Sequence, residues 1–285
     1  MADPDGLYVT DHLVPPVSVD GAERRPGPAP AGPSGERPLV VLVHGSLDRG
    51  TSFTRVLRRL PGYHVVTYDR RGYQRSRFAR PPGDEDAHTV HVADLLAIVD
   101  THRSPGQPTV VVGHSYGGSI ALGAALADPG AVRAVGAYEP PLPWLPFWPG
   151  HGTPPASVAP DPGETAERFF RRMVGDDAWE RLGERGRAER RADGPALVAE
   201  MAAIRRGSPP YDPGALTVPA VLGYGERTVP HHRDGVLWLA ERIPTAEVVS
   251  IPGAAHGAHL SHPDAFAALV HLTVTRAVQR AGERT

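Results

Sequence analysis

Short runs of consecutive apolar residues recur along the chain, separated by stretches in which apolar residues follow a helical spacing. Such runs, rich in valine, are typical of strands buried on both faces of a parallel sheet. Alternating strands and helices imply right-handed crossovers, so we predict an α/β fold with a mainly parallel central sheet flanked by helices. The predicted strands are residues 39–43, 63–68, 110–112, 132–138, 218–224 and 246–251.

The stretches between these strands predict the covering helices. In residues 88–102, Val92 and Val99 fall on one helical face. Serine and threonine at the start of residues 51–60 are suited to cap a short helix, and a Pro-Gly pair ends it. Further helices are predicted at residues 119–127, 234–243 and from 263 to about 280.

The alternation stops between residues 140 and 211, where no run typical of a strand is found. A proline-rich stretch containing Trp144, Phe147 and Trp148 is followed by charged, amphipathic stretches. We interpret residues 140–211 as a helical cap inserted into the sheet domain. The candidate cap helices are residues 164–174, 177–191 and 195–206, with Phe169, Phe170, Met173, Leu197, Met201 and Ile204 as the residues expected to be buried.

The N-terminal region, residues 1–36, has a different pattern. Residues 7–19 predict one or two short strands that prolines confine to a sheet edge, and residues 21–38 are rich in proline, glycine and charge, as surface loops are. The chain is thus divided into this edge region, an α/β core of residues 37–139 and 212–285, and the cap.

The amino-acid composition excludes several kinds of site and partner. The chain has no cysteine, which excludes disulfides, thiolate metal sites and a cysteine nucleophile, and is in keeping with a reducing compartment. All 30 basic residues are arginine, but acidic residues are interspersed among them and the net charge is −2. This pattern is typical of a mixed solvated surface, so we expect no nucleic-acid partner.

Nothing in the sequence indicates a membrane partner. No apolar run approaches the length of a membrane span, and the first residues lack the basic and then apolar pattern of a signal sequence. We therefore expect a cytoplasmic protein. The oligomeric state stays open between monomer and homodimer.

The strongest functional signal lies at residues 113–117, where the sequence GHSYG separates a predicted strand from a predicted helix. A nucleophile elbow has this context, because a sharp strand-to-helix turn exposes the serine hydroxyl at the end of the sheet. Glycines two residues before and two after the serine allow the backbone segments to approach closely. Ser115 is therefore the candidate nucleophile.

A serine hydroxyl needs an adjacent base that takes its proton and later returns it. Histidine suits this role because its ordinary pKa is about 6.5. His256 lies in a glycine-flanked loop directly after the last predicted strand, a position from which an imidazole reaches the rim of the sheet. None of the other histidines has this placement, so His256 is the candidate base.

Four segments resemble the α/β-hydrolase fold superfamily, and specifically its capped, esterase-like serine hydrolases. They are HGS at 44–46, YDRRGYQRS at 68–76, GHSYGG at 113–118 and GAAHGAHLSHPDAF at 253–266. In order along the chain they are similar to the oxyanion loop, the loop after the preceding strand, the elbow and the histidine loop of that family. The resemblance covers roughly residues 37–139 and 216–278 and leaves out the cap, where this family varies most.

An acyl substrate develops negative charge on its carbonyl oxygen as serine attacks, and two backbone N–H groups must stabilise it. By position these are the amides of Tyr116, just after the nucleophile, and Ser46, just after the His-Gly pair. Ser46 acts through its main chain in this interpretation.

The acid that orients the histidine is left open. Most family members carry an aspartate in a GxxD setting after the strand that ends near Gly225, but this chain has Thr228 there. A threonine accepts a hydrogen bond but has no charge to stabilise an imidazolium. Glu139 is the favoured alternative, because some branches of the family place their acid after the strand that follows the elbow helix. Glu226 and Asp234 are the other candidates.

Candidate pocket residues are His44, Trp144, Phe147 and Trp148, although packing of the cap on the core explains the three aromatic residues equally well.

The remaining histidines indicate no metal site. His256, His259 and His262 recur at every third position, but His262 precedes a proline at a helix start, so we expect no metal. The adjacent His231 and His232 have no obvious companions and are expected to be solvated.

The sequence thus predicts a serine hydrolase that cleaves a small, fairly apolar ester, lactone or thioester through an acyl-enzyme on Ser115, without a cofactor. The resemblance also leaves open a carbon-carbon bond hydrolase or an acyltransferase with the same residues. A ligand-binding protein of low turnover is a further alternative, favoured by the threonine at 228. A serine at 115 argues against epoxide hydrolase and dehalogenase activity, which in this family requires an aspartate.

Overall fold

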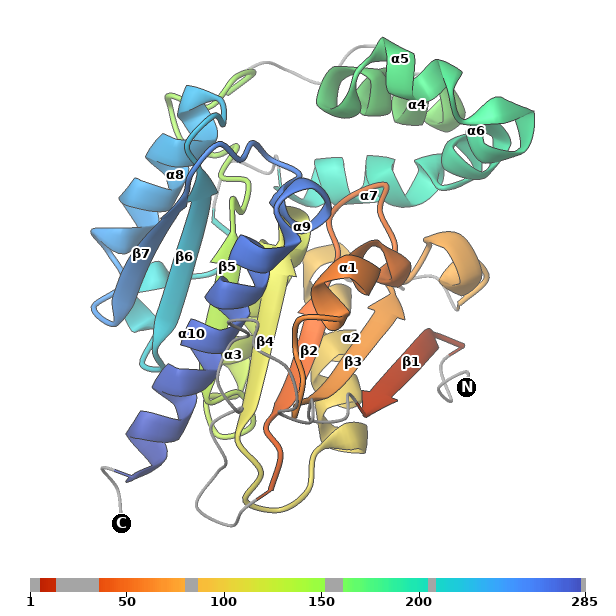
Figure 1. Cartoon of the computed structure of the whole chain (residues 1–285). Helices are drawn as coiled ribbons and strands as arrows, with labels where there is room; N and C mark the ends of the chain where they lie inside the picture. Colours follow the sequence, from red (N-terminus) through yellow and green to blue (C-terminus); the bar gives the residue numbers. More distant parts are fainter. Residues whose placement is uncertain (1–5, 14–35, 80–86, 152–160, 205–208, 283–285) are drawn as a thin grey trace, which may run out of the picture.

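The computed structural model describes residues 6–13, 36–79, 87–151, 161–204 and 209–282 (Figure 1). Within these ranges the strands form a seven-stranded sheet in the order β1-β3-β2-β4-β5-β6-β7. Only β1, at the edge, is antiparallel to its neighbour. The predicted fold class is therefore confirmed. The strands are β1 (Tyr8–Leu13), β2 (Leu39–Val43), β3 (His64–Asp69), β4 (Thr109–His114), β5 (Ala134–Tyr138), β6 (Ala220–Gly225) and β7 (Ala246–Ile251).

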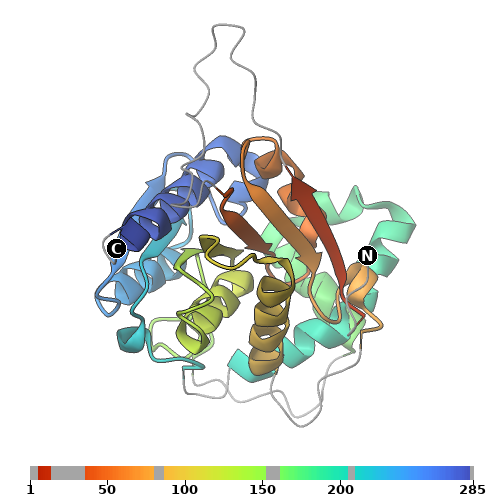
Figure 2. The same cartoon turned by 90° about the horizontal axis from the view of Figure 1, so that it is seen from below.

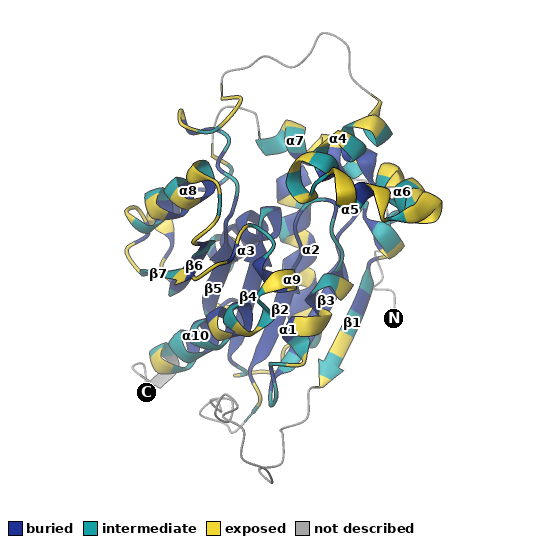
Figure 3. Cartoon of the chain, turned by 45° about the horizontal axis from the view of Figure 1, so that its top comes forward, coloured by how far each residue is buried: buried dark blue, intermediate teal, exposed yellow. Residues whose placement is uncertain are grey.

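Helices cover both faces of the sheet (Figures 1 and 2). Successive residues of a strand point to opposite faces, so Val40 and Leu42 of β2 pack on one side while Val41 packs on the other. Every residue of β2, β4 and β5 is buried, which explains their continuous apolar runs (Figure 3). One face carries α2 (Ala87–His102), α3 (Tyr116–Ala127) and α8 (Pro230–Ala240), and the other carries α1 (Thr54–Leu57) and α10 (Pro263–Gly282).

Between β5 and β6, the described residues form four α-helices that lie over the carboxyl ends of the strands (Figure 1). They share a small separate hydrophobic core with the rest of the chain, in which Phe170, Trp179 and Leu197 pack together with Leu47 and Tyr73. This shared core fixes the helices above the end of the sheet where the elbow lies. The helices are α4 (Pro162–Val174), α5 (Asp176–Glu180), α6 (Gly183–Ala192) and α7 (Gly194–Ile204).

Several expected elements differ in detail. The helix predicted at 177–191 is two helices, because the backbone turns at Gly183 with φ 64°. The helix predicted at 51–60 is a 3₁₀ turn, Gly50–Phe53, followed by α1, and neither is capped by a side chain. The helix predicted from 234 begins at Pro230, whose fixed φ suits the first helical turn.

Of the predicted N-terminal strands, only β1 falls within the described residues. Residues 14–19 and most of the loop predicted at 21–38 lie outside them. A short helix, α9 (Ala258–Ser261), precedes α10. None of the helices in the described part of the chain combines the length and apolarity needed to cross a membrane.

Candidate active site

Ser115 lies in a strained turn between β4 and α3. Its φ is 54° and its ψ is −127°, a backbone conformation that L-residues rarely adopt. The turn is possible because its neighbours lack side chains: a Cβ on Gly113 would lie 2.0 Å from the carbonyl oxygen of Gly117, and a Cβ on Gly117 would lie 2.2 Å from that of Val43. The two glycines of the GHSYG sequence are therefore a steric requirement, and the turn directs Ser115 into a cavity.

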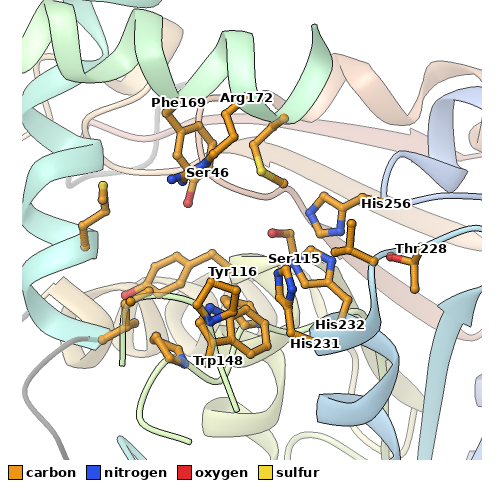
Figure 4. Close-up of a pocket in the computed structure, with 18 of the residues that line it drawn as sticks. Ser46, Ser115, Tyr116, Trp148, Phe169, Arg172, Thr228, His231, His232 and His256 are labelled. Carbon is orange, nitrogen blue, oxygen red and sulfur yellow. The ribbon is translucent and has the colours of Figure 1, made fainter. Parts of the chain in front are cut away.

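His256 and Glu139 meet beside this serine. His256 follows β7 and Glu139 follows β5, so both residues lie at the carboxyl end of the sheet. His256 Nδ1 is 2.7 Å from Glu139 Oε2, and the glutamate side chain has no exposed surface. Ser115 and His256 both line the cavity (Figure 4). The structure thus brings His256 and Glu139 into contact, and Ser115 lines the same cavity as the histidine.

The two other candidate acids lie elsewhere. Glu226 accepts a hydrogen bond from the backbone N–H of Gly253, at 2.8 Å. Asp234 pairs with Arg233 on the surface of α8. Neither carboxylate has a hydrogen bond to His256 among the described residues, so Glu139 is the carboxylate placed to orient the imidazole.

Thr228, at the position where the aspartate is usual, supports Glu139 instead of replacing it. Its hydroxyl is 2.9 Å from Glu139 Oε2 and donates to it. The backbone N–H of Gly225 donates to Oε1 at 2.8 Å. The end of β6 and the loop that follows it therefore hold the Glu139 carboxylate in place.

A second imidazole shares the same carboxylate. His232 Nδ1 is 2.9 Å from Glu139 Oε2, and the histidine is 5% exposed. Its ring stacks on Trp148 with the centroids 5.3 Å apart. The expectation that His232 is solvated was wrong, because the start of α8 at Pro230 turns this residue inward.

Hydrogen bonding decides the charge of the acid. Burial by itself would raise the pKa of Glu139, but the hydrogen bonds from His232 and His256 outweigh it and hold the pKa well below its ordinary value. Burial lowers the pKa of His256, while the bond to Glu139 opposes this effect. At neutral pH the site therefore combines an ionised carboxylate with a neutral imidazole, as a general base requires.

The predicted oxyanion loop lies against the nucleophile. A Cβ on Gly45 would be 3.0 Å from the Cβ of Ser115, so the backbone at Ser46 passes close to the serine. Ser46 and Tyr116 both line the cavity (Figure 4). Both residues predicted to supply the oxyanion amides therefore lie at the cavity that Ser115 lines.

Glu200 of α7 connects the cap helices to this loop, a role that the sequence did not indicate. Its side chain is 1% exposed and pairs with the buried guanidinium of Arg70. It also accepts hydrogen bonds from the hydroxyls of Ser46, at 2.7 Å, and Tyr73, at 2.8 Å. Arg70 in turn donates to the carbonyl oxygen of Gly45 at 3.0 Å. Burial opposes ionisation, but Arg70 lowers the pKa of Glu200 to about 2.

The cavity has a volume of about 450 Å³ and is lined mostly by apolar side chains from the cap and from the segment before it. Trp148 lines it, as predicted. His44, Trp144 and Phe147 do not, which corrects three of the expected pocket residues. The lining includes Trp148, Phe169, Met173, Leu197, Met201 and Ile204.

Each of the three excluded residues has another environment. His44 is fully buried beneath the loop, where its Nε2 accepts from the backbone N–H of Arg70 at 2.8 Å. Trp144 is buried against Tyr211. Phe147 is 43% exposed. Two tryptophans four residues apart thus have different surroundings, which the local sequence does not distinguish.

The three histidines spaced by three do not converge. His256 contacts Glu139, His259 Nε2 is 3.2 Å from Asp48 Oδ2, and His262 pairs with Ser261. Each of the three histidines thus has a different partner.

Comparison with known proteins shows which protein family this chain resembles. A sequence profile described as the alpha/beta hydrolase family matches residues 40–269. The lipase LipV of Mycobacterium tuberculosis is 37% identical over 109 residues, which are 38% of this chain and 39% of that protein. An epoxide hydrolase of Caballeronia sordidicola is 32% identical over 105 residues, 35% of this chain and 30% of its own length. The aligned regions therefore span two fifths or less of these relatives.

Solved structures have a fold similar to that of nearly the whole chain. The crystal structure of an alpha/beta hydrolase from Sphaerobacter thermophilus matches with a TM-score of 0.66 at 22% identity, covering 96% of this chain and 98% of the other. At this identity the likeness establishes the fold alone.

Proposed function

Because the chain belongs to the alpha/beta hydrolase family, we propose that it is a serine hydrolase that works through an acyl-enzyme on Ser115. The observation that supports this most directly is the hydrogen bond between His256 and Glu139, in the cavity that the elbow serine lines. The proposed reaction needs no cofactor.

In this mechanism His256 takes the proton of Ser115 as its oxygen attacks the carbonyl carbon. The electron pair moves to the carbonyl oxygen, which the amides of Ser46 and Tyr116 stabilise. His256 then gives the proton to the leaving group, and the acyl-enzyme remains. Water then attacks the acyl-enzyme while His256 takes its proton. His256 returns that proton to the Ser115 oxygen as the carboxylic acid product leaves. Glu139 stabilises the imidazolium in both halves.

We propose small, fairly apolar esters, lactones or thioesters as substrates, and the cytoplasm as the place of action. The lining supports the substrate class: Trp148, Phe169 and Leu197 offer apolar surface, and Met173 and Met201 are flexible side chains that adapt to different shapes. A carbon-carbon bond hydrolase or an acyltransferase would use the same residues with a different substrate or acceptor.

Two alternatives are less well supported. A ligand-binding role was favoured by the uncharged Thr228, but Glu139 supplies the missing charge and Thr228 donates to it. Several relatives are named epoxide hydrolases. That activity would require an aspartate nucleophile where this chain has Ser115.

Covalent labelling with a fluorophosphonate probe tests the proposal. The folded protein should be labelled, Ser115→Ala should not be, and Ser119→Ala, which alters a buried serine one helical turn further along, should retain labelling. A folded wild-type protein that takes up no probe would overturn the proposal. Hydrolysis of p-nitrophenyl esters, lactones and thioesters of increasing chain length then identifies the substrate class.

A further inference from the structure

One oxygen atom in the site accepts more hydrogen bonds than the proposed reaction needs. Glu139 Oε2 is 2.7 Å from His256 Nδ1, 2.9 Å from His232 Nδ1 and 2.9 Å from the hydroxyl of Thr228. Orienting the base requires the first contact only. The second imidazole, from α8, has no part in the mechanism described above.

Aromatic rings contact the His232 side chain. Its ring lies between the ring of Trp148, at 5.3 Å, and the ring of His256, at 4.4 Å. Because the carboxylate is ionised, His232 Nδ1 must carry a proton to bond with it. In the neutral ring, Nε2 is then the acceptor. His232 and His231 both line the cavity (Figure 4).

The two imidazoles compete for one negative charge. Each hydrogen bond to a carboxylate stabilises its ionised form and weakens it as a partner for any other proton.

Other ionisable groups around the pair do not remove this competition. From β4, His114 lies with its ring 4.8 Å from that of His256, and its Nε2 bonds to the His256 carbonyl oxygen. From α9, His259 pairs with Asp48 and not with Glu139. The other charged or titratable residues that line the cavity are His231 of α8, Arg172 of α4, Arg227 of the loop after β6, Glu200 of α7 and Tyr116 of α3.

The charges of these groups leave Glu139 as the central anion. Glu200 is bound to Arg70, and Glu139 is the carboxylate in contact with the two histidines. Any sharing of Glu139 therefore acts directly on His256.

We propose that His232 is a positioning residue that, by sharing Glu139 with His256, keeps the base neutral and ready to take the proton of Ser115 in mildly acidic solution. This inference rests on the proposed function. The lowered pKa of His256, which burial causes first and to which His232 adds, agrees with it. The N–H donor and the ring on Trp148 are thus two separate contributions of His232, one electrostatic and one of packing.

The test uses His232→Phe, which removes the donor and keeps a ring against Trp148. The acidic midpoint of kcat/KM should move upward by about 0.5–1 pH unit, because His256 then has a larger share of the carboxylate. His231→Phe is the matched control: its histidine lines the same cavity, has no bond to Glu139, and already has a pKa lowered to about 4, first by burial. This control should leave the midpoint in place.

A titration of the histidine ring nitrogens by NMR, with His256 assigned from His256→Gln, measures the same ionisation without turnover. It separates the two proposals, because labelling of Ser115 can fail while the His256 midpoint still moves. His232→Leu also removes the donor and replaces His232→Phe if that variant does not fold. A midpoint that stays, falls, or moves equally in His231→Phe would overturn the inference.

Discussion

Of the three candidate carboxylates, Glu139 is the one that contacts His256. Glu139 has no exposed surface and receives hydrogen bonds from His256, His232, Thr228 and the amide of Gly225. An unpaired carboxylate in this position would be strongly disfavoured, and four donors compensate for its burial. Its charge is therefore available to stabilise the imidazolium of the proposed mechanism.

Glu139→Gln should lower kcat/KM by about 10³- to 10⁴-fold while the protein stays folded, since an amide has no charge and favours the wrong histidine tautomer. The measurement is hydrolysis of a p-nitrophenyl ester at neutral pH. Glu226→Gln is the control, because its carboxylate accepts from Gly253 and does not touch His256. Activity near that of the wild type in Glu139→Gln would contradict the assignment.

At the scale of elements, the contact between α7 and the loop after β3 joins the helices that lie over the sheet to the backbone at Ser46. Arg70 and Glu200 form a buried ion pair, and Glu200 accepts from the hydroxyl of Ser46. The approach is close: a Cβ on Gly72 would lie 2.6 Å from the Cβ of Ala196. The docking of α7 and the position of Ser46 therefore depend on each other.

Glu200→Gln should reduce the free energy of unfolding by about 3–5 kcal/mol, because it leaves the guanidinium of Arg70 buried without a counter-charge. Urea unfolding of both proteins measures the difference. The matched control is Glu180→Gln, which breaks solvent-exposed pairs with Arg171 and Arg187 and should have a much smaller effect. Equal, small effects of the two variants would show that the buried pair does not hold the cap.

At the scale of the whole molecule, buried ionisable groups should make the protein sensitive to acid. Interactions with histidines or Arg70 lower the pKa values of Glu139, Asp48 and Glu200 despite burial, and burial lowers those of His91 and His114. In the unfolded chain these groups have ordinary pKa values, near 4 for the carboxyls and 6.5 for the histidines. In acid the unfolded state therefore binds more protons than the folded state, and the free energy of unfolding decreases as the pH is lowered.

We expect the free energy of unfolding to be constant between about pH 7 and 9. It should begin falling below about pH 6.5 as the histidines of the unfolded chain become protonated, and fall more steeply between about pH 4.5 and 2. Urea unfolding at pH 7, 5.5, 4 and 3 measures this profile. Equal stability at pH 3 and pH 7 would contradict it.

The hydrophobic pattern predicted the sheet, and the residues that follow the strands predicted the elbow and the histidine loop, because all of these depend on local order along the chain. Continuous apolar runs are required of strands buried on both faces, and only glycine fits beside the nucleophile. The chain position of Ser115 and His256 follows from the same rule, since residues directly after parallel strands meet at one edge of the sheet.

The tertiary structure decided which side chains surround them. The strand order places the end of β5 between β4 and β6, so Glu139 reaches His256, and the early start of α8 brings in His232. Glu200 occurs in a helix with ordinary amphipathic spacing, and its burial arises only where that helix meets Arg70. Such contacts join residues far apart in the chain, and their energies depend on burial and distance, which local sequence does not encode.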